Sequence, residues 1–457
     1  METDSNHGPG GCSSSQRDFR GTEVCGGDRG MSELPFKTKH KLDVHTHTTL
    51  SPDTFHKLER FAGTYANFVR VKAHQTKPCC AQMVNGRGEV VRVIEDNAYD
   101  AEARLRSCDC DNVTVQVLSP TPMMIPDYVD NGADAAEICK ILNDDNLRFI
   151  RDFPERFVAL GAVPMRFPDL AVKEMERIKS LGMRGIEINS NVNGEDLDSP
   201  EFFPVFEAAA DLNLCIFLHP WGGFMMPQED TLKRRMHPER NWRPWLVAMP
   251  SETALAFDAL LRSGVHERLP QLRVLYAHGG GAFPALLGRL EHGAYCRPDL
   301  FAKAADKDAW QVVQECGVYT DTLTHNPWAL KMLVDILGSK RIAVGSDFPY
   351  PLGEVDPFDC GSLLDPKGNR CPYSTSKKIY PGHMVEHLPS TEAQQEEAWK
   401  HFNWLPQANS DGSRSLPLLS YQQKENILFR TGREWLGFES RIETNSRMGW
   451  SEVPSKP

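Results

Sequence analysis

The sequence has no apolar run of the ~20 residues that a membrane-spanning helix requires. It also has no excess of basic residues, since 51 Lys and Arg stand against 62 Asp and Glu, for a formal net charge of −11. A negative balance disfavours nucleic acid and acidic membrane surfaces as partners, unless a local basic patch overrides it. The opening residues Met1-Glu2-Thr3-Asp4 do not begin an apolar secretory core, so we expect no signal peptide.

The 12 cysteines form no recognisable framework. Cys79-Cys80 and Cys108-x-Cys110 lack the spacing of a zinc ribbon. No cysteine adjoins a histidine in a motif that would indicate a thiol nucleophile. In the absence of a secretory leader, we expect free thiols in a reducing compartment, which predicts a cytoplasmic, cytosolic protein.

The chain length of 457 residues is enough for one large domain or two ordinary ones, and no internal repeat is found. Composition and periodicity divide the chain into five parts. These are a disordered N-terminal tail at 1–38, a barrel domain at 39–355 with a small insertion at 51–97, an irregular insertion at 356–420, a C-terminal barrel helix at 421–440, and a tail at 441–457.

Within the barrel domain, strand-like runs alternate with helical patterns. The expected strands are Leu42–His47, Val113–Ser119, Phe157–Val163, Gly185–Asn189, Leu214–His219, Arg273–His278, Val318–Asp321 and Arg341–Asp347. The expected helices include Ala135–Phe149, Leu170–Leu181, Ser251–Leu269, Asn326–Leu337 and Gln422–Leu436.

Eight alternating strands and helices predict an α/β fold of the (β/α)8 TIM-barrel type. A doubly wound open sheet is the alternative. The barrel is favoured because closure places the first strand beside the last, where both carry polar motifs. The insertion after the first strand predicts a small β unit around Gln82–Glu95 with a turn at Asn85-Gly86, and a long loop insertion follows the eighth strand.

The most informative motif is Asp43-Val44-His45-Thr46-His47 at the end of the first strand. Alternate residues of a strand share a face, so His45 and His47 point the same way. One such motif is weak, because the histidines can be unrelated polar residues at a strand end. Three further polar motifs close apolar runs, namely His219-Pro220-Trp221, His278-Gly279-Gly280-Gly281 and Gly345-Ser346-Asp347.

His45, His47, His219 and Asp347 offer three nitrogens and one oxygen, which suits Zn2+, although Fe, Co and Mn stay open. His278 is a fifth candidate, as a ligand, as an unligated base that takes or relays a proton from activated water, or as a buried histidine bonded to backbone.

Arginines are natural clamps for carboxylates, which makes Arg92 and Arg289 candidates, although most arginines are solvated surface residues. Trp221 and Trp245 can wall an apolar pocket, although spacing alone favours core positions.

Five stretches, covering the motifs above, closely resemble one enzyme family, the 2-amino-3-carboxymuconate-6-semialdehyde decarboxylases of the amidohydrolase superfamily. The similarity covers roughly Lys41–Leu352 and the last helix, Gln422–Phe438. The five stretches are Leu42–His47, Phe217–Trp221, Pro244–Thr253, Ala277–Pro284 and Gly345–Glu354.

The resemblance implies a zinc-dependent, non-oxidative decarboxylase of the kynurenine pathway of tryptophan catabolism. It would release CO2 from 2-amino-3-carboxymuconate 6-semialdehyde to give 2-aminomuconate 6-semialdehyde, and so limit quinolinate formation. The family pattern places one Zn2+ per subunit on His45, His47, His219 and Asp347. It makes His278 the water-activating base. It makes Arg92 and Arg289 substrate-binding, with Arg289 reaching the neighbouring subunit of a homodimer, and places Trp245 and Tyr350 in the pocket.

The sequence departs from the family at Gly222, where Asp is common, in the loop 223–243, and in the insertion 356–419. Two other functions stay open. One is a related amidohydrolase-fold hydrolase or aromatic-acid decarboxylase that shares the five polar residues but not the two arginines. The other is a non-catalytic metal-binding scaffold.

Overall fold

The computed structural model describes residues 40–77, 80–223, 230–237, 241–300, 306–354, 379–402, 405 and 415–438. Within them, eight strands form a single sheet in the order β1-β5-β6-β7-β10-β11-β12-β13, and every neighbouring pair is parallel. The strands are β1 (Leu42–Thr48), β5 (Val115–Pro120), β6 (Phe157–Ala162), β7 (Gly185–Asn189), β10 (Cys215–His219), β11 (Val274–Tyr276), β12 (Val318–Asp321) and β13 (Ile342–Ala343).

The sheet closes where the chain after β13 returns to β1. The backbone N–H of Val44 donates to the carbonyl of Val344 at 2.8 Å, and the N–H of Asp347 donates to the carbonyl of His45 at 2.8 Å. The predicted (β/α)8 barrel is therefore confirmed, and the open-sheet alternative is wrong. Closure brings the polar ends of the first and last strands to one mouth, the carboxyl end of the parallel strands.

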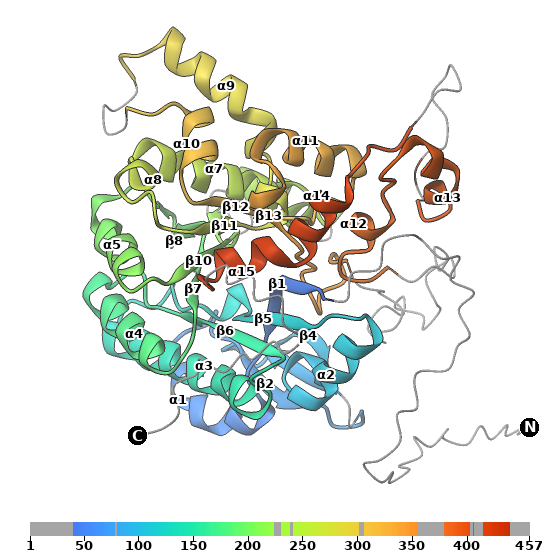
Figure 1. Cartoon of the computed structure of the whole chain (residues 1–457). Coiled ribbons are helices and arrows are strands. Elements are labelled where there is room, and N and C mark those ends of the chain that lie inside the picture. The colour runs from blue at the N-terminus through green and yellow to red at the C-terminus, as the bar shows by residue number, and fades with distance from the viewer. Residues whose placement is uncertain are drawn as a thin grey trace, which may run out of the picture. The chain divides into compact units, whose positions relative to one another are not determined.

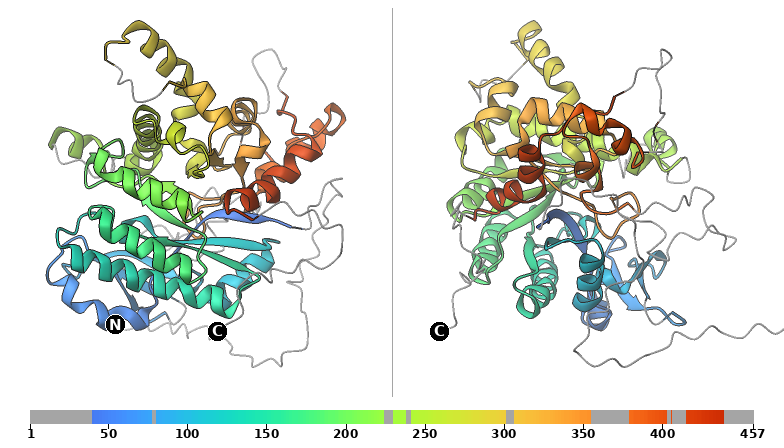
Figure 2. Two further views of the ribbon diagram at one scale, coloured as in Figure 1. Left: turned by 60° about the vertical axis from the view of Figure 1, so that its left-hand side comes forward. Right: turned by 45° about the vertical axis from the view of Figure 1, so that its right-hand side comes forward.

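Helices lie around the strands (Figures 1 and 2). Among the described residues, no helix combines the length and the hydropathy that a membrane span needs. The helices are α1 (Glu59–Ala62), α2 (Ala101–Cys110), α3 (Gly132–Asp152), α4 (Pro168–Ser180), α5 (Phe203–Asp211), α6 (Asp230–Arg235), α7 (Met249–Arg262), α8 (Val265–Arg268), α9 (Phe283–Cys296), α10 (Ala309–Glu315), α11 (Pro327–Leu337), α12 (His383–His387), α13 (Gln395–Trp399), α14 (Tyr421–Glu425) and α15 (Thr431–Trp435).

The expected helix over Ser251–Leu269 is wrong in two respects. The helix is interrupted between α7 and α8 because Gly264 adopts a left-handed conformation with φ of 72°. The helix also begins earlier than expected, since α7 starts at Met249 directly after a π-helical turn, and the Ser251 hydroxyl donates to the carbonyl of Val247 at 2.9 Å.

The last strand and the last helix also differ from their expected extents. Regular pairing of β13 stops at Ala343, because the chain beyond it turns toward β1 and Asp347 takes a positive φ of 58°. The expected helix over Gln422–Leu436 is divided into α14 and α15 by a π-helical stretch at Asn426–Arg430.

The insertion after β1 contains an antiparallel sheet of β2 (Arg70–Ala73), β3 (Cys80–Val84) and β4 (Val90–Glu95), as predicted for its second half. Arg92 lies on β4. Three expected parts lie wholly or mostly outside the described residues. These are the tails at 1–38 and 441–457, and most of the insertion at 356–420. The domain boundaries stay a prediction.

The C-terminal helix α15 packs beneath the barrel mouth. Trp435 is fully buried, its ring lies 6.4 Å from that of Phe217, and Phe217 lies 4.8 Å from the ring of His45. Gly432 makes the approach of α15 possible, since a Cβ at this position would lie 2.9 Å from Val44 Cγ1. Apolar packing thus continues from α15 to the first histidine of the mouth.

Arg104 on α2 is a fully buried cation that secures the end of β1. Its guanidinium donates to the carbonyl of His47 at 2.9 and 3.0 Å, to the carbonyl of Asn97 at 3.0 Å, and to the side chain of Gln116 at 2.9 Å. Burial lowers the pKa of Arg104 to about 10, so the side chain still carries its charge at neutral pH.

We expect Arg104→Met to lower the free energy of unfolding by about 3 kcal/mol, because buried acceptors lose their donor. Equilibrium urea unfolding followed by circular dichroism measures the change. Arg106→Met, on the exposed face of the same helix, is the matched control and should change stability by no more than about 0.5 kcal/mol. Equal midpoints for the two variants would contradict this account.

Candidate metal centre

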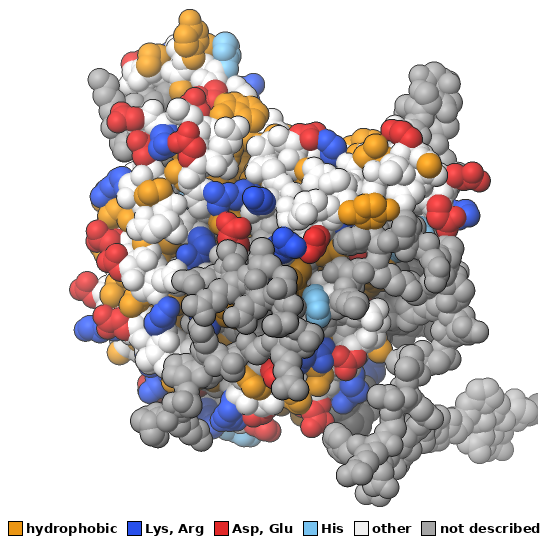
Figure 3. Space-filling model, in the orientation of Figure 1, with side chains coloured by type: hydrophobic (Ala, Val, Ile, Leu, Met, Phe, Trp, Pro, Cys, Tyr) orange, Lys and Arg blue, Asp and Glu red, His pale blue; other side chains and the backbone are white. Residues whose placement is uncertain are grey.

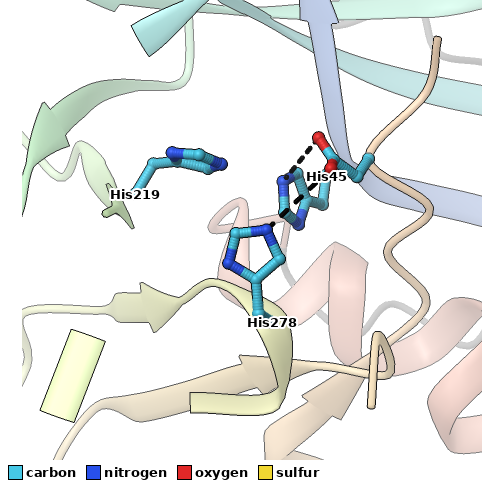
Figure 4. Close-up of side chains that lie close together, drawn as sticks. His45, His219 and His278 are labelled. Atoms are coloured by element: carbon cyan, nitrogen blue, oxygen red, sulfur yellow. Dashed lines mark ion pairs between the residues drawn. The ribbon is translucent and has the colours of Figure 1, made fainter. Parts of the chain in front are cut away.

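Five predicted site residues meet at the barrel mouth. His45 and His47 come from β1, His219 ends β10, His278 follows β11, and Asp347 follows β13. Figure 4 shows the rings of His45, His219 and His278 turned toward one another from three different elements. The convergence follows from parallel strands whose carboxyl ends share one rim.

The nitrogen and oxygen atoms of these side chains lie within a few ångström of one another. His45 Nε2 is 3.2 Å from His47 Nε2, and Asp347 Oδ1 is 3.5 and 3.2 Å from these two atoms. Asp347 Oδ2 is 3.9 Å from His278 Nε2. The ring of His219 lies 4.8 Å from that of His47 and 5.0 Å from that of His278.

The arrangement offers more donors than a four-coordinate ion needs. One atom each from His45, His219, His278 and Asp347 lies within 4.8 Å of the others, and His47 adjoins both His45 and Asp347. The position of His278 is therefore compatible with both of its predicted roles, as a ligand or as a base.

The protonation states of the residues suit a divalent cation. Burial lowers the pKa of His47 to about 4 and that of His219 well below its usual value, so both rings are neutral and present a lone pair. Burial raises the pKa of Asp347, but the neighbouring His278, His45 and His47 outweigh burial, lower the pKa well below its usual value and keep the carboxylate ionised. Neutral imidazoles with one carboxylate fit zinc and similar ions.

Unpartnered polar atoms support the same fit. Among the described residues, neither ring nitrogen of His219 or of His278 has a hydrogen-bond partner, although all four atoms are buried. Leaving a buried polar group unpaired costs about 1–3 kcal/mol each, so such atoms point to a missing partner. A cation at the centre would bind one of the two nitrogens of His219.

Asp321, at the end of β12, holds two of the five residues in place, and the sequence analysis missed it. Its Oδ2 lies 2.6 Å from His45 Nδ1 and accepts from the N–H of His278 at 2.8 Å, while Oδ1 accepts from the N–H of Gly279 at 2.6 Å. Holding Nδ1 turns Nε2 of His45 toward the centre. The available signal was that Asp321 closes a strand at the same rim.

The charge of Asp321 also acts on His45. Burial lowers the pKa of His45, but hydrogen bonds and charges of Asp321 and Asp347 outweigh burial and raise it to about 10. Two buried carboxylates thus call for positive charge at His45, and a divalent cation on Nε2 supplies it in place of a proton.

Backbone strain gathers at the same mouth. His278 and Asp347 have positive φ values of 57° and 58°, a region that side chains with a Cβ rarely adopt. Gly281 is required by space as well, because a Cβ there would lie 2.3 Å from the carbonyl oxygen of Pro250. Such strain is maintained only where the surrounding structure fixes it, as at functional sites.

A second missed residue is Glu187 on β7, which is buried below His47. Its Oε2 lies 3.9 Å from His47 Nδ1, and neither carboxylate oxygen has a hydrogen-bond partner within the described part of the chain. Burial raises the pKa of Glu187 well above its usual value. In the sequence, Glu187 lies inside a short strand-like run, which gave no sign of a role.

Arg92 and Tyr350 border this centre. The guanidinium carbon of Arg92 lies 4.8 Å from the centre of the Tyr350 ring, which is 5.6 Å from the ring of His47. The hydroxyl of Tyr350 is 2.7 Å from that of Thr121, which fixes the ring. The structure therefore brings an arginine of the small sheet to the barrel mouth.

The other substrate-binding candidates lie farther out. Trp245 packs with Trp221 in a small apolar cluster around Ala248 and Met249. Arg289 is exposed on α9, and no contact joins it to the five central residues within the described ranges. Both views of the molecule show α9 projecting beyond the helices around it (Figures 1 and 2).

Gly222 has a structural reason for its departure from the family pattern. Its φ is +82°, and a Cβ there would lie 3.1 Å from the side-chain oxygen of Asn191. Asn191 in turn donates to the carbonyl of Trp221 at 3.1 Å. Any other residue would be strained at this turn. Much of the loop that follows, at 224–229 and 238–240, lies outside the described residues.

Comparison with known proteins gives two similar curated relatives. A 2-amino-3-carboxymuconate-6-semialdehyde decarboxylase of Dictyostelium discoideum is 38% identical over 329 residues, which are 71% of this chain and 85% of the relative. A protein of the same name from Caenorhabditis elegans is 32% identical over 357 residues, covering 69% of this chain and 87% of the relative.

A solved structure of similar fold is the 5-carboxyvanillate decarboxylase of Novosphingobium aromaticivorans, which contains bound manganese. It has a TM-score of 0.59 at 17% identity and covers 87% of this chain and 97% of its own. A sequence model of the amidohydrolase family matches residues 42–382, which include all five central residues. The chain belongs to the amidohydrolase family and is a metal-dependent decarboxylase related to the 2-amino-3-carboxymuconate-6-semialdehyde decarboxylases.

Proposed function

We propose that this enzyme converts 2-amino-3-carboxymuconate 6-semialdehyde to 2-aminomuconate 6-semialdehyde and CO2, in the kynurenine pathway of tryptophan catabolism, where it limits quinolinate formation. The observation that carries the proposal is the placement of Arg92 beside the five-residue metal centre, in a chain 38% identical to a relative with that name. An anionic substrate needs such a cation next to the reacting group.

We assign His45, His47, His219 and Asp347 as the ligands of one Zn2+ per subunit. The neutral rings of His47 and His219, with His45 and one carboxylate, fit tetrahedral zinc. Mn2+, which is bound in the structure of the 5-carboxyvanillate decarboxylase, stays open as an alternative. When bound, the ion supplies Lewis-acid polarisation and positive charge next to the substrate.

His278 is assigned as the residue that holds and moves a proton. Asp321 fixes its backbone by accepting from its N–H at 2.8 Å, so the ring has a defined place. Its two ring nitrogens have no hydrogen-bond partner among the described residues and can exchange a proton with water or substrate. Loss of CO2 leaves an electron pair on carbon, and the proton that replaces CO2 completes the reaction.

Arg92 and Arg289 are assigned as clamps for the two carboxylates of the substrate, and Tyr350 and Trp245 as pocket walls. Arg92 is already stacked on Tyr350 at the mouth, whereas Arg289 is exposed on the projecting helix α9. We therefore place Arg289 in the neighbouring subunit's site of a homodimer.

An exposed apolar surface on and after α9 supports the dimer. Tyr295 is 83% exposed and Leu300 67% exposed, and Figure 3 shows hydrophobic side chains at the projecting upper end of the molecule, where Figure 1 draws α9. Exposed apolar side chains that gather into one patch mark interaction surfaces. Covering them with a second copy would bring α9, and Arg289 with it, against the partner.

A cytosolic location belongs to the same proposal. The supporting observation is that five cysteines of the described residues are free thiols, namely Cys108, Cys139, Cys215, Cys296 and Cys316. Free thiols are usual in a reducing compartment.

The function is tested by incubating purified enzyme with the semialdehyde and following both its near-ultraviolet absorbance and CO2 release, with elemental analysis of the same preparation. We expect loss of absorbance, stoichiometric CO2 and at least one equivalent of zinc per subunit. Turnover of 5-carboxyvanillate in place of the semialdehyde would identify an aromatic-acid decarboxylase instead. Metal-loaded protein that turns over neither substrate would leave the scaffold alternative.

The role of His278 is tested by His278→Ala. We expect the variant to keep its metal and to lose turnover by about 100-fold or more, because a proton-transfer group is removed and the four ligands remain. Exposed His56, replaced by Ala, is the control and should leave both quantities unchanged. Stoichiometric loss of metal from His278→Ala would show that His278 is a ligand.

The shared site is tested by mixing two inactive variants. We expect Arg92→Ala and Arg289→Ala each to lose about 10- to 100-fold in kcat/KM, since each removes a charged hydrogen-bond donor. A mixed dimer has one complete site, so it should regain up to half of the wild-type activity. Dimers of either variant alone provide the control. Verified mixed dimers without rescue would exclude an arginine that crosses the interface.

A further inference from the structure

A second histidine cluster lies just beyond the family match, which ends at residue 382. His383 and His387 are the first and last residues of α12, and His401 follows α13. One ring nitrogen from each of the three histidines lies within 4.8 Å of the other two. These residues belong to the segment that departs from the family, and the proposed decarboxylation does not use them.

The three rings lie close together, with His387 stacked on His401 and His383 tilted against both. The ring of His387 lies 3.7 Å from that of His401, nearly parallel at 15°, and 4.4 Å from that of His383. His383 and His387 are four residues apart on one helix, so their side chains share a face. Two histidines at this spacing are a common pair of metal ligands.

The outer nitrogens of the helical pair have oxygen partners. His387 Nε2 is 2.8 Å from the hydroxyl of Tyr380, and His383 Nε2 is 3.4 Å from the carbonyl oxygen of His401. In metal sites, such partners on one ring nitrogen orient the other nitrogen toward the ion. His387 is only 5% exposed, and its Nδ1 has no hydrogen-bond partner among the described residues.

The charges around the cluster affect protons and metal ions differently. Burial, and after it the charges of His383, His401, Lys424 and Lys41, lower the pKa of His387 to about 2, so the ring is neutral at neutral pH and one of its nitrogens keeps a lone pair. The two lysines also repel a metal cation. Glu386 offsets part of that repulsion.

The lysines are themselves held in place. Lys41 Nζ lies 3.6 Å from Glu386 Oε1, and Lys424 donates to the carbonyl of Glu386 at 3.0 Å and to that of Leu388. Because this positive charge is fixed, we expect weaker binding here than at the barrel mouth, where carboxylates lie next to the histidines.

We propose that His383, His387 and His401 form a second metal site that binds one Zn2+, or a similar nitrogen-preferring divalent ion, with water as the remaining ligand. Three imidazoles suit zinc, copper and nickel far better than magnesium or calcium. The site is separate from the barrel mouth and does not depend on the proposed substrate.

The number of bound metal ions can be measured directly, so the test is a zinc titration of the metal-free, full-length protein in competition with a chromophoric chelator. Wild-type protein should bind two equivalents per subunit, one tightly and one more weakly. His387→Gln and His401→Gln should each bind one equivalent. His219→Ala, which removes a ligand of the barrel-mouth site, should keep the weaker equivalent, and exposed His56→Gln should keep both.

A wild-type protein that binds a single equivalent would overturn the proposal, and so would a second equivalent that survives in both His387→Gln and His401→Gln. His401 is only half-buried, so its variant serves if His387→Gln fails to fold. The readout is metal stoichiometry, and it is independent of whether the semialdehyde is the substrate.

Discussion

Closure of the barrel between β1 and the chain after β13 is the constraint on which the site depends. The Oγ of Ser346 donates to Asp43 Oδ2 at 2.6 Å, and its backbone N–H donates to Asp43 Oδ1 at 3.1 Å, across 303 positions of sequence. These bonds place Asp347, the next residue, against the histidines of β1. Among the described residues, Asp347 is the only carboxylate within 4 Å of both His45 and His47, so these bonds position the counter-charge that the two histidines share.

This arrangement leaves a set of buried polar groups that have no hydrogen-bond partner among the described residues. These groups lie at one end of the barrel and are the ring nitrogens of His219 and His278 and the carboxylate of Glu187. At the same end, His278 and Asp347 have positive φ values. The rest of the fold offsets these costs with apolar packing from β1 to Trp435 and with Arg104 on the carbonyl of His47. A centre that is unfavourable by itself and favourable with a cation is what metal-dependent chemistry requires.

The sequence alone predicted the barrel and brought out the five central residues because both rest on strand ends. A polar residue that closes an apolar run must lie at the rim, so His45, His47, His219, His278 and Asp347 could be named without a structure. Asp321 also closes a strand at this rim, so the same rule applied to it although it was missed. Glu187 could not be named, because an acidic residue inside a strand-like run has no distinguishing neighbour. The break at Gly264 was also missed, because a glycine inside an apolar periodicity is compatible with a continuous helix. Contacts between residues that are far apart in the sequence decide these cases, and such contacts cannot be read from local spacing.

The segment beyond the family match is tied to the catalytic mouth through one buried carboxylate. Glu354 closes the loop that carries Asp347, and its backbone N–H donates to the carbonyl of Ser346 at 2.8 Å. Its side chain accepts from the N–H groups of Gly382 at 2.8 Å and Met384 at 3.3 Å, at the start of α12. The hydrogen bonds of Glu354 therefore join the start of α12, which carries His383 and His387, to the residue before Asp347. The segment beyond the family match is thus bonded to the loop that carries the carboxylate of the metal centre, and it belongs to the structure around that site.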